Sequence, residues 1–289
     1  MTSPTVLTPL DPRYPSRLRQ IVRPPASLTV SGGPLDADCA VAVVGSREAT
    51  ADAAAFAREI AGALVHAGAV VVSGGAVGID AAAHRGALAA GGRTWVIAAT
   101  GPDGCYPAEH AELFETIGRG PGAMVWPFQH PAAFLARNRV LVALAHAVVV
   151  IQAGARSGAL HAAECARRLG RPLWVVPSAP WSPDRDRFAG SCHLLEHGGR
   201  PLTRLDSFLA ALGLGGGRAD ADLPNYPPNS IESSLLQVMS NVPLHIDMLT
   251  VRAHQTPQAT AAALLTLALE NVVVEGPPGF FRRRHAPNH

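Results

Sequence analysis

The chain has 289 residues, roughly the length of two domains, and 48% of them are hydrophobic, which allows a sizeable core. Its longest apolar run, around residues 140–151, is interrupted by His146 and falls short of the ~20 residues that a membrane-spanning helix needs. The start, Met-Thr-Ser-Pro, lacks the basic and apolar pattern of a secretory signal. We therefore expect neither a membrane protein nor a secreted one.

All 24 basic residues are arginine, against 22 acidic residues, so the net charge is only +2. Without lysine, the chain cannot use a Schiff-base lysine, a phosphate-loop lysine or a lysine general base. The cysteines show no paired spacing, which favours a reducing compartment, the cytoplasm, over a disulfide framework or a cysteine zinc site. They are Cys39, Cys105, Cys165 and Cys192.

The charge is unevenly distributed along the chain. Residues 1–210 hold 19 arginines and 16 acids, a balance of +3, whereas residues 211–289 hold 5 arginines and 6 acids, a balance of −1. Residues 137–171 alone hold six arginines and one acid, Glu164. Such a cluster gives either a local positive field or simply a solvated helix face.

Short apolar runs alternate with Ala-rich helical stretches between Val41 and Val176. The predicted strands are Val41–Val44, Val70–Val72, Trp95–Ala98, Met124–Trp126, Val148–Ile151 and Leu173–Val176. The predicted helices include Ala51–His66, Ile79–Ala89, Ala108–Ile117 and Gly158–Leu169. Continuous apolar strands suit a parallel sheet that is buried on both faces. The pattern predicts an α/β fold with a Rossmann-like, doubly wound, mostly parallel sheet.

The C-terminal part has a different pattern. A stretch rich in Gly, Pro and Asp precedes three short helical patterns and two strand patterns around a Gly-Pro-Pro-Gly turn, which together outline a winged helix. The helical patterns are Ile231–Ser240, Leu244–Ala253 and Pro257–Leu269, and the strand patterns are Val272–Glu275 and Phe280–Arg284. We expect an N-terminal segment packing on the core (1–38), a Rossmann-like domain (39–212), a linker (213–229) and a winged-helix domain (230–285).

Three of the predicted strands are followed by turns rich in Gly and Ser that lead into helices, at residues 45–47, 73–80 and 152–159. Open α/β sheets bind ligands beyond the carboxyl ends of their strands, where free backbone N–H groups at helix starts attract anions. One such turn is commonly only a tight turn, but three at one sheet edge predict a phosphate-binding site. The candidate anion-binding residues are Gly45, Ser73, Gly74, Gly75, Gly78, Ser157 and Gly158.

Arginines accompany these turns. Arg47 follows the first predicted strand, Val41–Val44. Arg137-Asn138-Arg139 are expected to open the helix that precedes the fifth predicted strand, Val148–Ile151. A guanidinium can pair with phosphate and stack on a base, although a surface ion pair is the alternative for each arginine. Neither GxGxxG nor GxxxxGK[ST] occurs, so we expect no dinucleotide cofactor and no ATP hydrolysis. We expect no other cofactor either.

Catalytic and metal-binding patterns are weak. Ser73 lacks a G-x-S-x-G elbow and an evident His–acid pair. Asp80, with His84 one turn further on, is more typical of a helix cap than of a general base. His193 and His197 are four apart but lack a firm third ligand. We therefore expect no catalytic residue and no metal site.

From about Asp11 to Arg284 the chain resembles the bacterial DNA-processing protein A family (DprA, also called Smf). The resemblance is carried by VAVVGSR, SGGAVGIDAAAHRGAL, YPAEH, FLARNRV, RSGALHAAE with GRPLWVVP, and the winged helix. It implies a non-enzymatic homodimer that binds single-stranded DNA and helps to load the recombinase RecA during natural transformation.

By position, Arg47 and Arg137-Asn138-Arg139 match the DNA-contacting residues of that family, and Gly74, Gly75 and Gly78 match its anion-binding loop. The predicted DNA-binding residues are Ser46, Arg47, Arg137, Asn138, Arg139 and Arg156. The chain departs from the family pattern at Val77, where Arg is usual, at Pro177-Ser178, where Pro-Gly is usual, and at Ser191-Cys192-His193, where Gly-Cys-Asn is usual.

Two other functions stay open. The first is a nucleotide-binding or nucleotide-cleaving enzyme related to phosphoribohydrolases of the Lonely Guy family. Residues 156–161 lack the PGG-x-GT-x-x-E motif of those enzymes, although Glu164 lies one turn further on. The second is a duplex-DNA regulator that works through the winged helix. Because residues 257–269 contain no basic side chain, we expect this domain to contact protein instead.

Overall fold

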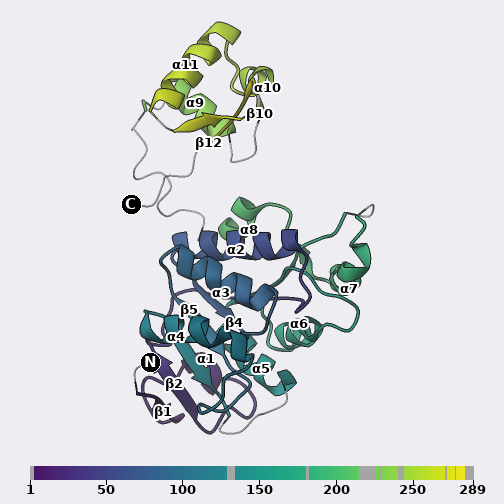
Figure 1. Ribbon diagram of the computed structural model, residues 1–289. Coiled ribbons are helices and arrows are strands. Elements are labelled where there is room, and N and C mark those ends of the chain that lie inside the picture. Colours follow the sequence, from purple (N-terminus) through teal and green to yellow (C-terminus); the bar gives the residue numbers. More distant parts are fainter. Residues whose placement is uncertain are drawn as a thin grey trace. The chain divides into compact units, whose positions relative to one another are not determined.

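The computed structural model describes residues 3–128, 134–179, 182–214, 226–227, 230–239, 244–270, 272–276 and 278–283, apart from the side chains of Phe134, Leu135 and Arg283. The chain divides into two compact units, Met1–Gly215 and Gly216–His289 (Figure 1). The linker proposed at 213–229 lies mostly outside the described residues, so the sequence-based domain boundaries stay predictions. Within the described part, no helix is long and apolar enough to cross a membrane.

A nine-stranded sheet runs through the first unit in the order β1-β2-β6-β5-β4-β3-β7-β8-β9. Its strands are β1 (Thr5–Leu7), β2 (Leu28–Gly32), β3 (Ala40–Val44), β4 (Val70–Ser73), β5 (Thr94–Ile97), β6 (Ala123–Trp126), β7 (Ala147–Val150), β8 (Leu173–Val175) and β9 (Arg200–Pro201). The seven strands from β6 to β9 are parallel, whereas β1 and β2 pair antiparallel. The order reverses between β3 and β7, so the doubly wound, mostly parallel sheet is confirmed.

Helices cover both faces of the sheet (Figure 1). Neighbouring residues of a strand point to opposite faces, so a strand made only of apolar residues supplies a core on each side. Val41 and Val43 of β3 share a core with α2 (Ala51–His66), α3 (Ile79–Ala89) and α8 (Leu205–Ala211), whereas Ala42 and Val44 share a core with α1 (Ser16–Arg19), α5 (Phe134–Leu144) and α6 (Gly158–Arg168). This double burial explains the continuous apolar strands. The helices are α1 (Ser16–Arg19), α2 (Ala51–His66), α3 (Ile79–Ala89), η1 (Ala108–His110), α4 (Ala111–Arg119), α5 (Phe134–Leu144), α6 (Gly158–Arg168), η2 (Arg185–Phe188), α7 (Ala189–Glu196) and α8 (Leu205–Ala211).

The N-terminal segment contributes two strands that the sequence pattern did not predict. β2 pairs with β6, Val30 opposite Val125, and β1 extends the sheet beyond it. Between these strands Leu18 and Tyr14 are buried, and the Tyr14 hydroxyl donates a hydrogen bond to the Pro25 carbonyl at 2.8 Å. The segment therefore closes one edge of the sheet and belongs to the same core.

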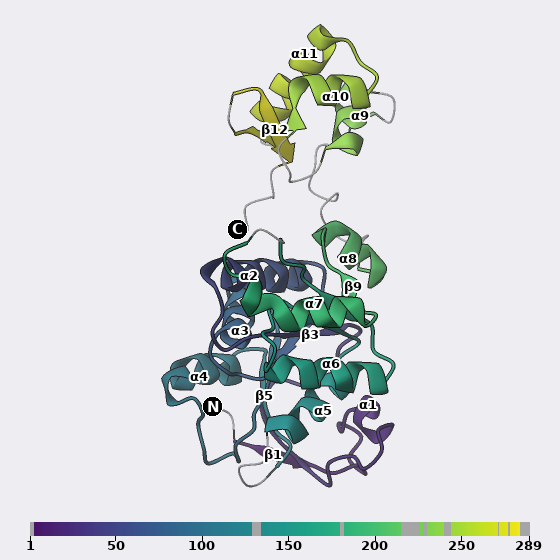
Figure 2. The same ribbon diagram turned by 90° about the vertical axis from the view of Figure 1, so that its right-hand side faces the viewer.

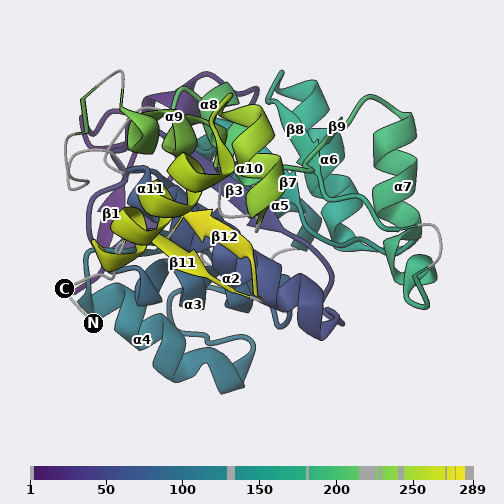
Figure 3. The same ribbon diagram turned by 90° about the horizontal axis from the view of Figure 1, so that it is seen from above.

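The second unit is a winged helix with its own core, as predicted (Figure 3). It comprises α9 (Ile231–Val238), β10 (Leu244–His245), α10 (Ile246–Arg252), α11 (Pro257–Leu269), β11 (Val273–Glu275) and β12 (Phe280–Arg283), with its three strands in the order β10-β12-β11. The second helix begins at Ile246, two residues later than predicted, because Leu244 pairs with Phe281 and His245 caps the helix. The core contains Leu235, Leu249 and Leu267.

Candidate nucleic-acid interface

A pocket of about 450 Å³ lies at the carboxyl ends of β3 and β7, where the strand order reverses. It brings together most of the predicted residues, namely Gly45, Ser46, Arg47, Arg137, Asn138, Arg156, Ser157 and Gly158. A larger pocket of about 720 Å³ lies against the N-terminal segment and contains none of the predicted site residues. The smaller pocket is therefore the candidate interface.

The three glycine-rich loops fix one another by backbone contacts. The N–H of Ser46 donates to the carbonyl of Gln152 at 2.7 Å, and the N–H of Ile79 donates to the carbonyl of Ser46 at 3.2 Å. Gly78 has φ +81°, and a Cβ there would lie 2.4 Å from the carbonyl oxygen of Ser46. Glycine is therefore required at position 78, both by its left-handed backbone and by the close approach of the neighbouring loop.

Arg137 forms part of the pocket wall and is only 5% exposed. Its guanidinium lies directly against Gly74, where a Cβ would fall 1.5 Å from Nη1. Among the described residues, Nε of Arg137 has no hydrogen-bond partner. A buried cationic group with an unused donor costs free energy unless a partner arrives, which is the property expected of an anion-binding group.

Asp80 partly balances this charge from the first turn of α3. Its carboxylate is buried and accepts a hydrogen bond from the N–H of Ala76 at 3.3 Å. Burial raises the pKa of the Asp80 carboxyl, and the positive charge of Arg137 opposes that rise. Burial also lowers the pKa of Arg137, but a guanidinium stays protonated in proteins. The pocket therefore contains two buried groups of opposite charge, with the exposed Arg47 and Arg156 at its rim.

The start of α6 supplies a polar wall. Ser157 is the N-cap residue, and its hydroxyl accepts from the N–H of Ala159 at 3.2 Å. Asn138 donates from Nδ2 to the carbonyl of Gly158 at 3.2 Å and so connects α5 to this turn. A Cβ at Gly158 would meet open space. The positive end of the α6 dipole therefore faces a space that an anion can approach.

Ser73 and Gly75, which we predicted to bind an anion, do not line the pocket and make structural contacts instead. The Ser73 hydroxyl is fully buried and donates to the carbonyl of Val43 at 2.6 Å, which connects β4 to β3. Gly75 has φ +78°, and a Cβ there would lie 2.8 Å from the Phe114 ring. Its carbonyl is hydrogen-bonded to Nδ1 of His110 at 2.9 Å. Both residues therefore connect the loop after β4 to neighbouring elements of the unit.

Arg139 is separated from the other predicted DNA-binding residues. Its guanidinium donates to the carbonyl of Arg23 in the N-terminal segment, and it does not line the pocket. Residues two apart on a helix are rotated by about 200°, so Arg137 and Arg139 point to nearly opposite sides. The expectation that residues 137–139 open a helix was also wrong, because α5 begins at Phe134.

Sequence reasoning singled out His84 but did not predict its burial. His84 lies on α3 one turn after Asp80, and its Nδ1 is hydrogen-bonded to the Thr94 hydroxyl at 2.7 Å. Burial, helped by the neighbouring His110 and Arg137, lowers the pKa of His84 to about 3. The four-residue spacing of Asp80 and His84 indicated a shared helix face, but nothing in it indicated burial. His84 is therefore a neutral core residue at physiological pH.

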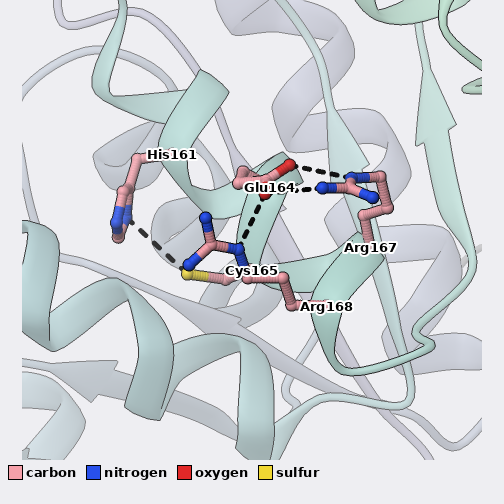
Figure 4. Close-up of polar contacts among 5 residues, drawn as sticks. All are labelled: His161, Glu164, Cys165, Arg167 and Arg168. Atoms are coloured by element: carbon pink, nitrogen blue, oxygen red, sulfur yellow. Dashed lines mark hydrogen bonds and ion pairs between the residues drawn. The ribbon is translucent and has the colours of Figure 1, made fainter.

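Glu164, the acid weighed for a nucleotide-cleaving enzyme, is held by two arginines of its own helix (Figure 4). The side chains of Arg167 and Arg168 donate to it at 2.8 and 2.7 Å and lower its pKa to about 2. The carboxylate is therefore ionised at physiological pH. It also does not line the pocket. This arrangement does not suit a general acid, which needs a pKa near the working pH.

Comparison with known proteins agrees with this architecture. Residues 5–213 match the family described as DNA recombination-mediator protein A, and residues 219–279 match the DprA winged helix domain. The chain belongs to the DNA recombination-mediator protein A family. The resemblance inferred from the sequence motifs is thereby confirmed.

Relatives in this family differ in how much of their length is matched. Protein Smf of Synechocystis is 30% identical over 98% of this chain and 81% of its own length. DNA processing protein DprA of Streptococcus pneumoniae is 35% identical over 70% of this chain and 72% of its own. A Mycobacterium tuberculosis relative is 43% identical, but the match covers 60% of this chain and only 45% of that protein.

Two solved family structures share the fold. The crystal structure of DNA processing protein A from Streptococcus pneumoniae gives a TM-score of 0.66 at 32% identity, covering 72% of this chain and 74% of that chain. A structure of DNA processing protein A from Helicobacter pylori, described for its single-stranded DNA binding mode, gives 0.65 at 27% identity, covering 73% and 96%.

Proposed function

We propose that this protein binds single-stranded DNA in the pocket between the loops after β3 and β7 and acts as a recombination mediator. The single observation that carries the proposal is Arg137, a buried guanidinium against Gly74 whose Nε lacks a partner among the described residues. Arg137 lines the pocket, so its guanidinium can pair there with a phosphate oxygen. The proposal also agrees with the single-stranded DNA binding described for the Helicobacter pylori relative.

The charges around the pocket fit a strand better than a compact anion. Arg47 and Arg156 are exposed and approach the pocket from two different loops. Exposed guanidinium groups on either side of a phosphate site can pair with neighbouring phosphates of one strand and stack on its unpaired bases. Sequence-independent binding of this kind depends on the backbone charge and therefore on salt.

Following the family resemblance, we further propose a homodimer in the cytoplasm that protects incoming single strands and helps to load RecA in natural transformation. We propose no enzymatic activity and no cofactor. The ion pairs of Glu164 with two arginines support this proposal, because they do not suit Glu164 as the catalytic acid of a nucleotide-cleaving enzyme.

We propose that the winged-helix unit contacts protein. Its third helix, α11, exposes Leu265 and Leu269, at 63% and 75%, and α10 exposes Val251 at 69%. Apolar side chains and a net charge of −1 over residues 211–289 suit a protein surface better than a DNA backbone.

A mobility-shift assay with single-stranded DNA, duplex DNA and free nucleotides side by side tests the proposed function. We expect preference for the single strand and weaker binding by Arg47→Ala and Arg156→Ala. Arg119→Ala is the matched control, because this exposed arginine lies on α4 and pairs with Glu115. Preference for free nucleotides, or equal binding by all three variants and the unmodified protein, would contradict the proposal.

A further inference from the structure

The end of helix α7 carries three exposed side chains with metal-binding donors. His193, Glu196 and His197 each offer one ligand atom, and these atoms all lie within 4.8 Å of one another. The sequence pattern pointed only to the two histidines. The helical turn adds Glu196, because residues three and four apart share a helix face. We propose that these three residues bind a divalent transition-metal ion, of which Zn²⁺ fits best.

The two imidazoles are already arranged side by side. Their ring centroids are 4.1 Å apart, with an interplanar angle of 37°. Nδ1 of His197 is hydrogen-bonded to the backbone carbonyl of His193 at 2.8 Å. Because a carbonyl can only accept, Nδ1 of His197 carries the proton and Nε2 keeps its lone pair for a ligand. Metal-binding histidines use the same arrangement, in which the second nitrogen is held by a hydrogen bond.

The donor set selects the class of ion. Two imidazoles and one carboxylate, with a position left for water, form a common zinc environment. Mg²⁺ and Ca²⁺ prefer sets made only of oxygen. The ligands also lie at the C-terminal end of α7, which ends at Glu196, and the partial negative charge of a helix C-terminus favours a cation.

A bound ion would restrain the last turn of α7, whose first turn is already held by hydrogen bonds. Ser191 accepts from the N–H of Ala153 through its hydroxyl at 3.0 Å and donates its own N–H to the Ala153 carbonyl at 3.1 Å. At the opposite end of α7 the three ligand residues are exposed, and the helix lies beside α6 (Figure 2). The site is separate from the DNA pocket, so the inference does not rest on the proposed function.

Helix α6 offers a matched control. His161 and Cys165 are also four apart, with Nδ1 and Sγ 3.7 Å from each other, but the carboxylate between them is held by Arg167 and Arg168 (Figure 4). That pair therefore lacks a free third ligand. His161→Ala removes an imidazole from a neighbouring helix and leaves the proposed site intact.

Calorimetric titration of the metal-free full chain with ZnCl₂ tests the site. We expect one ion per chain, at least about tenfold weaker binding in His193→Ala and in His197→Ala, weaker binding in Glu196→Gln, and unchanged binding in His161→Ala. All of these positions but 161 are exposed on the helix surface, where alanine and glutamine are good helix formers.

Hydrogen exchange gives a second readout of the same site. Zn²⁺ should increase protection of the α7 amides in the unmodified chain and in His161→Ala, but not in His193→Ala. Absence of Zn²⁺ binding, binding that either histidine variant retains in full, or loss of binding in His161→Ala would overturn the inference.

Discussion

The sheet edge that forms the pocket and the surface of the winged-helix unit use their side chains in opposite ways. At the sheet edge, arginines from three segments meet around glycine-rich loops, and one of them, Arg137, is buried. On the winged helix, the exposed side chains of α10 and α11 include Val251, Leu265 and Leu269. A buried cationic group with an unpaired hydrogen-bond donor favours an anion as its partner, whereas exposed apolar groups favour protein contact. The comparison teaches that burial and charge favour anion binding in one unit and protein contact in the other, as we propose.

The largest effect is expected from removing the buried carboxylate of Asp80, whose charge opposes that of Arg137. Asp80→Asn would leave the charge of Arg137 uncompensated in the interior and lower the free energy of unfolding by about 3–5 kcal/mol. Urea denaturation measures the change. Asp52→Asn, in the exposed first turn of α2, is the control and should cost about 1 kcal/mol or less. Equal effects of the two substitutions would show that Asp80 and Arg137 are not coupled.

The next effect concerns the packing of Arg137 on the loop after β4. Gly74→Ala places a methyl group where Nη1 now lies, so the guanidinium must move, at a cost of about 1–3 kcal/mol in stability. Single-strand affinity should fall by about tenfold or more, which corresponds to about 1.4 kcal/mol. Gly62→Ala on α2, where the nearest atoms are 3.9 Å away, should keep full DNA affinity. Undiminished DNA affinity in Gly74→Ala would contradict the role of Arg137.

The third effect is a pH dependence that comes from His84. Its pKa is about 3 in the folded protein against 6.5 in the unfolded chain, so below pH 6.5 only the unfolded chain takes up this proton. Stability is therefore lost as the pH falls from 6.5 towards 3, by about 2 kcal/mol at pH 5 relative to neutral pH. Denaturant titrations at pH 7 and pH 5 should show a smaller difference for His84→Gln. An identical pH dependence in the two proteins would rule out His84 as its source.

The smallest effect is expected from the second unit. Residues 228–289, which contain the core of the winged helix, should show no duplex-DNA binding tighter than ~0.1 mM at physiological salt, the weak limit of non-specific binding. A fluorescence titration with labelled duplex measures this. Micromolar binding would remove the contrast between the two units and favour the duplex-DNA regulator.

Much of the fold could be predicted because local patterns agree with it. α2, α3 and α11 begin and end at the predicted residues, because caps such as Thr50 and Thr256 mark their starts. β1, β2 and β9 could not be predicted, because β1 and β9 are very short, polar residues interrupt β2 at Thr29 and Ser31, and all three are defined by pairing with a distant segment. Arg200–Pro201, for example, becomes a strand only beside β8.

The candidate site could be predicted only in part. The rule that ligands bind at the carboxyl ends of parallel strands located the three loops correctly. Burial of Arg137 depends on the close approach of α5 to Gly74, which comes from tertiary packing and not from local sequence. The opposite orientation of Arg139 was accessible from helix geometry alone, since the two arginines are two residues apart.

The central claim, that arginines at the sheet edge hold the backbone of a single strand, is tested most directly by salt dependence. Each phosphate neutralised on a single strand contributes about −0.7 to the slope of log affinity against log salt concentration, so three arginine contacts predict a slope of about −2. The measurement is a fluorescence-anisotropy titration of labelled single-stranded DNA at several salt concentrations, with the unmodified chain and Arg47→Ala. We predict a slope of about −2 that becomes shallower by about 0.7 in Arg47→Ala. A flat salt response, or the same slope in both proteins, would contradict the account.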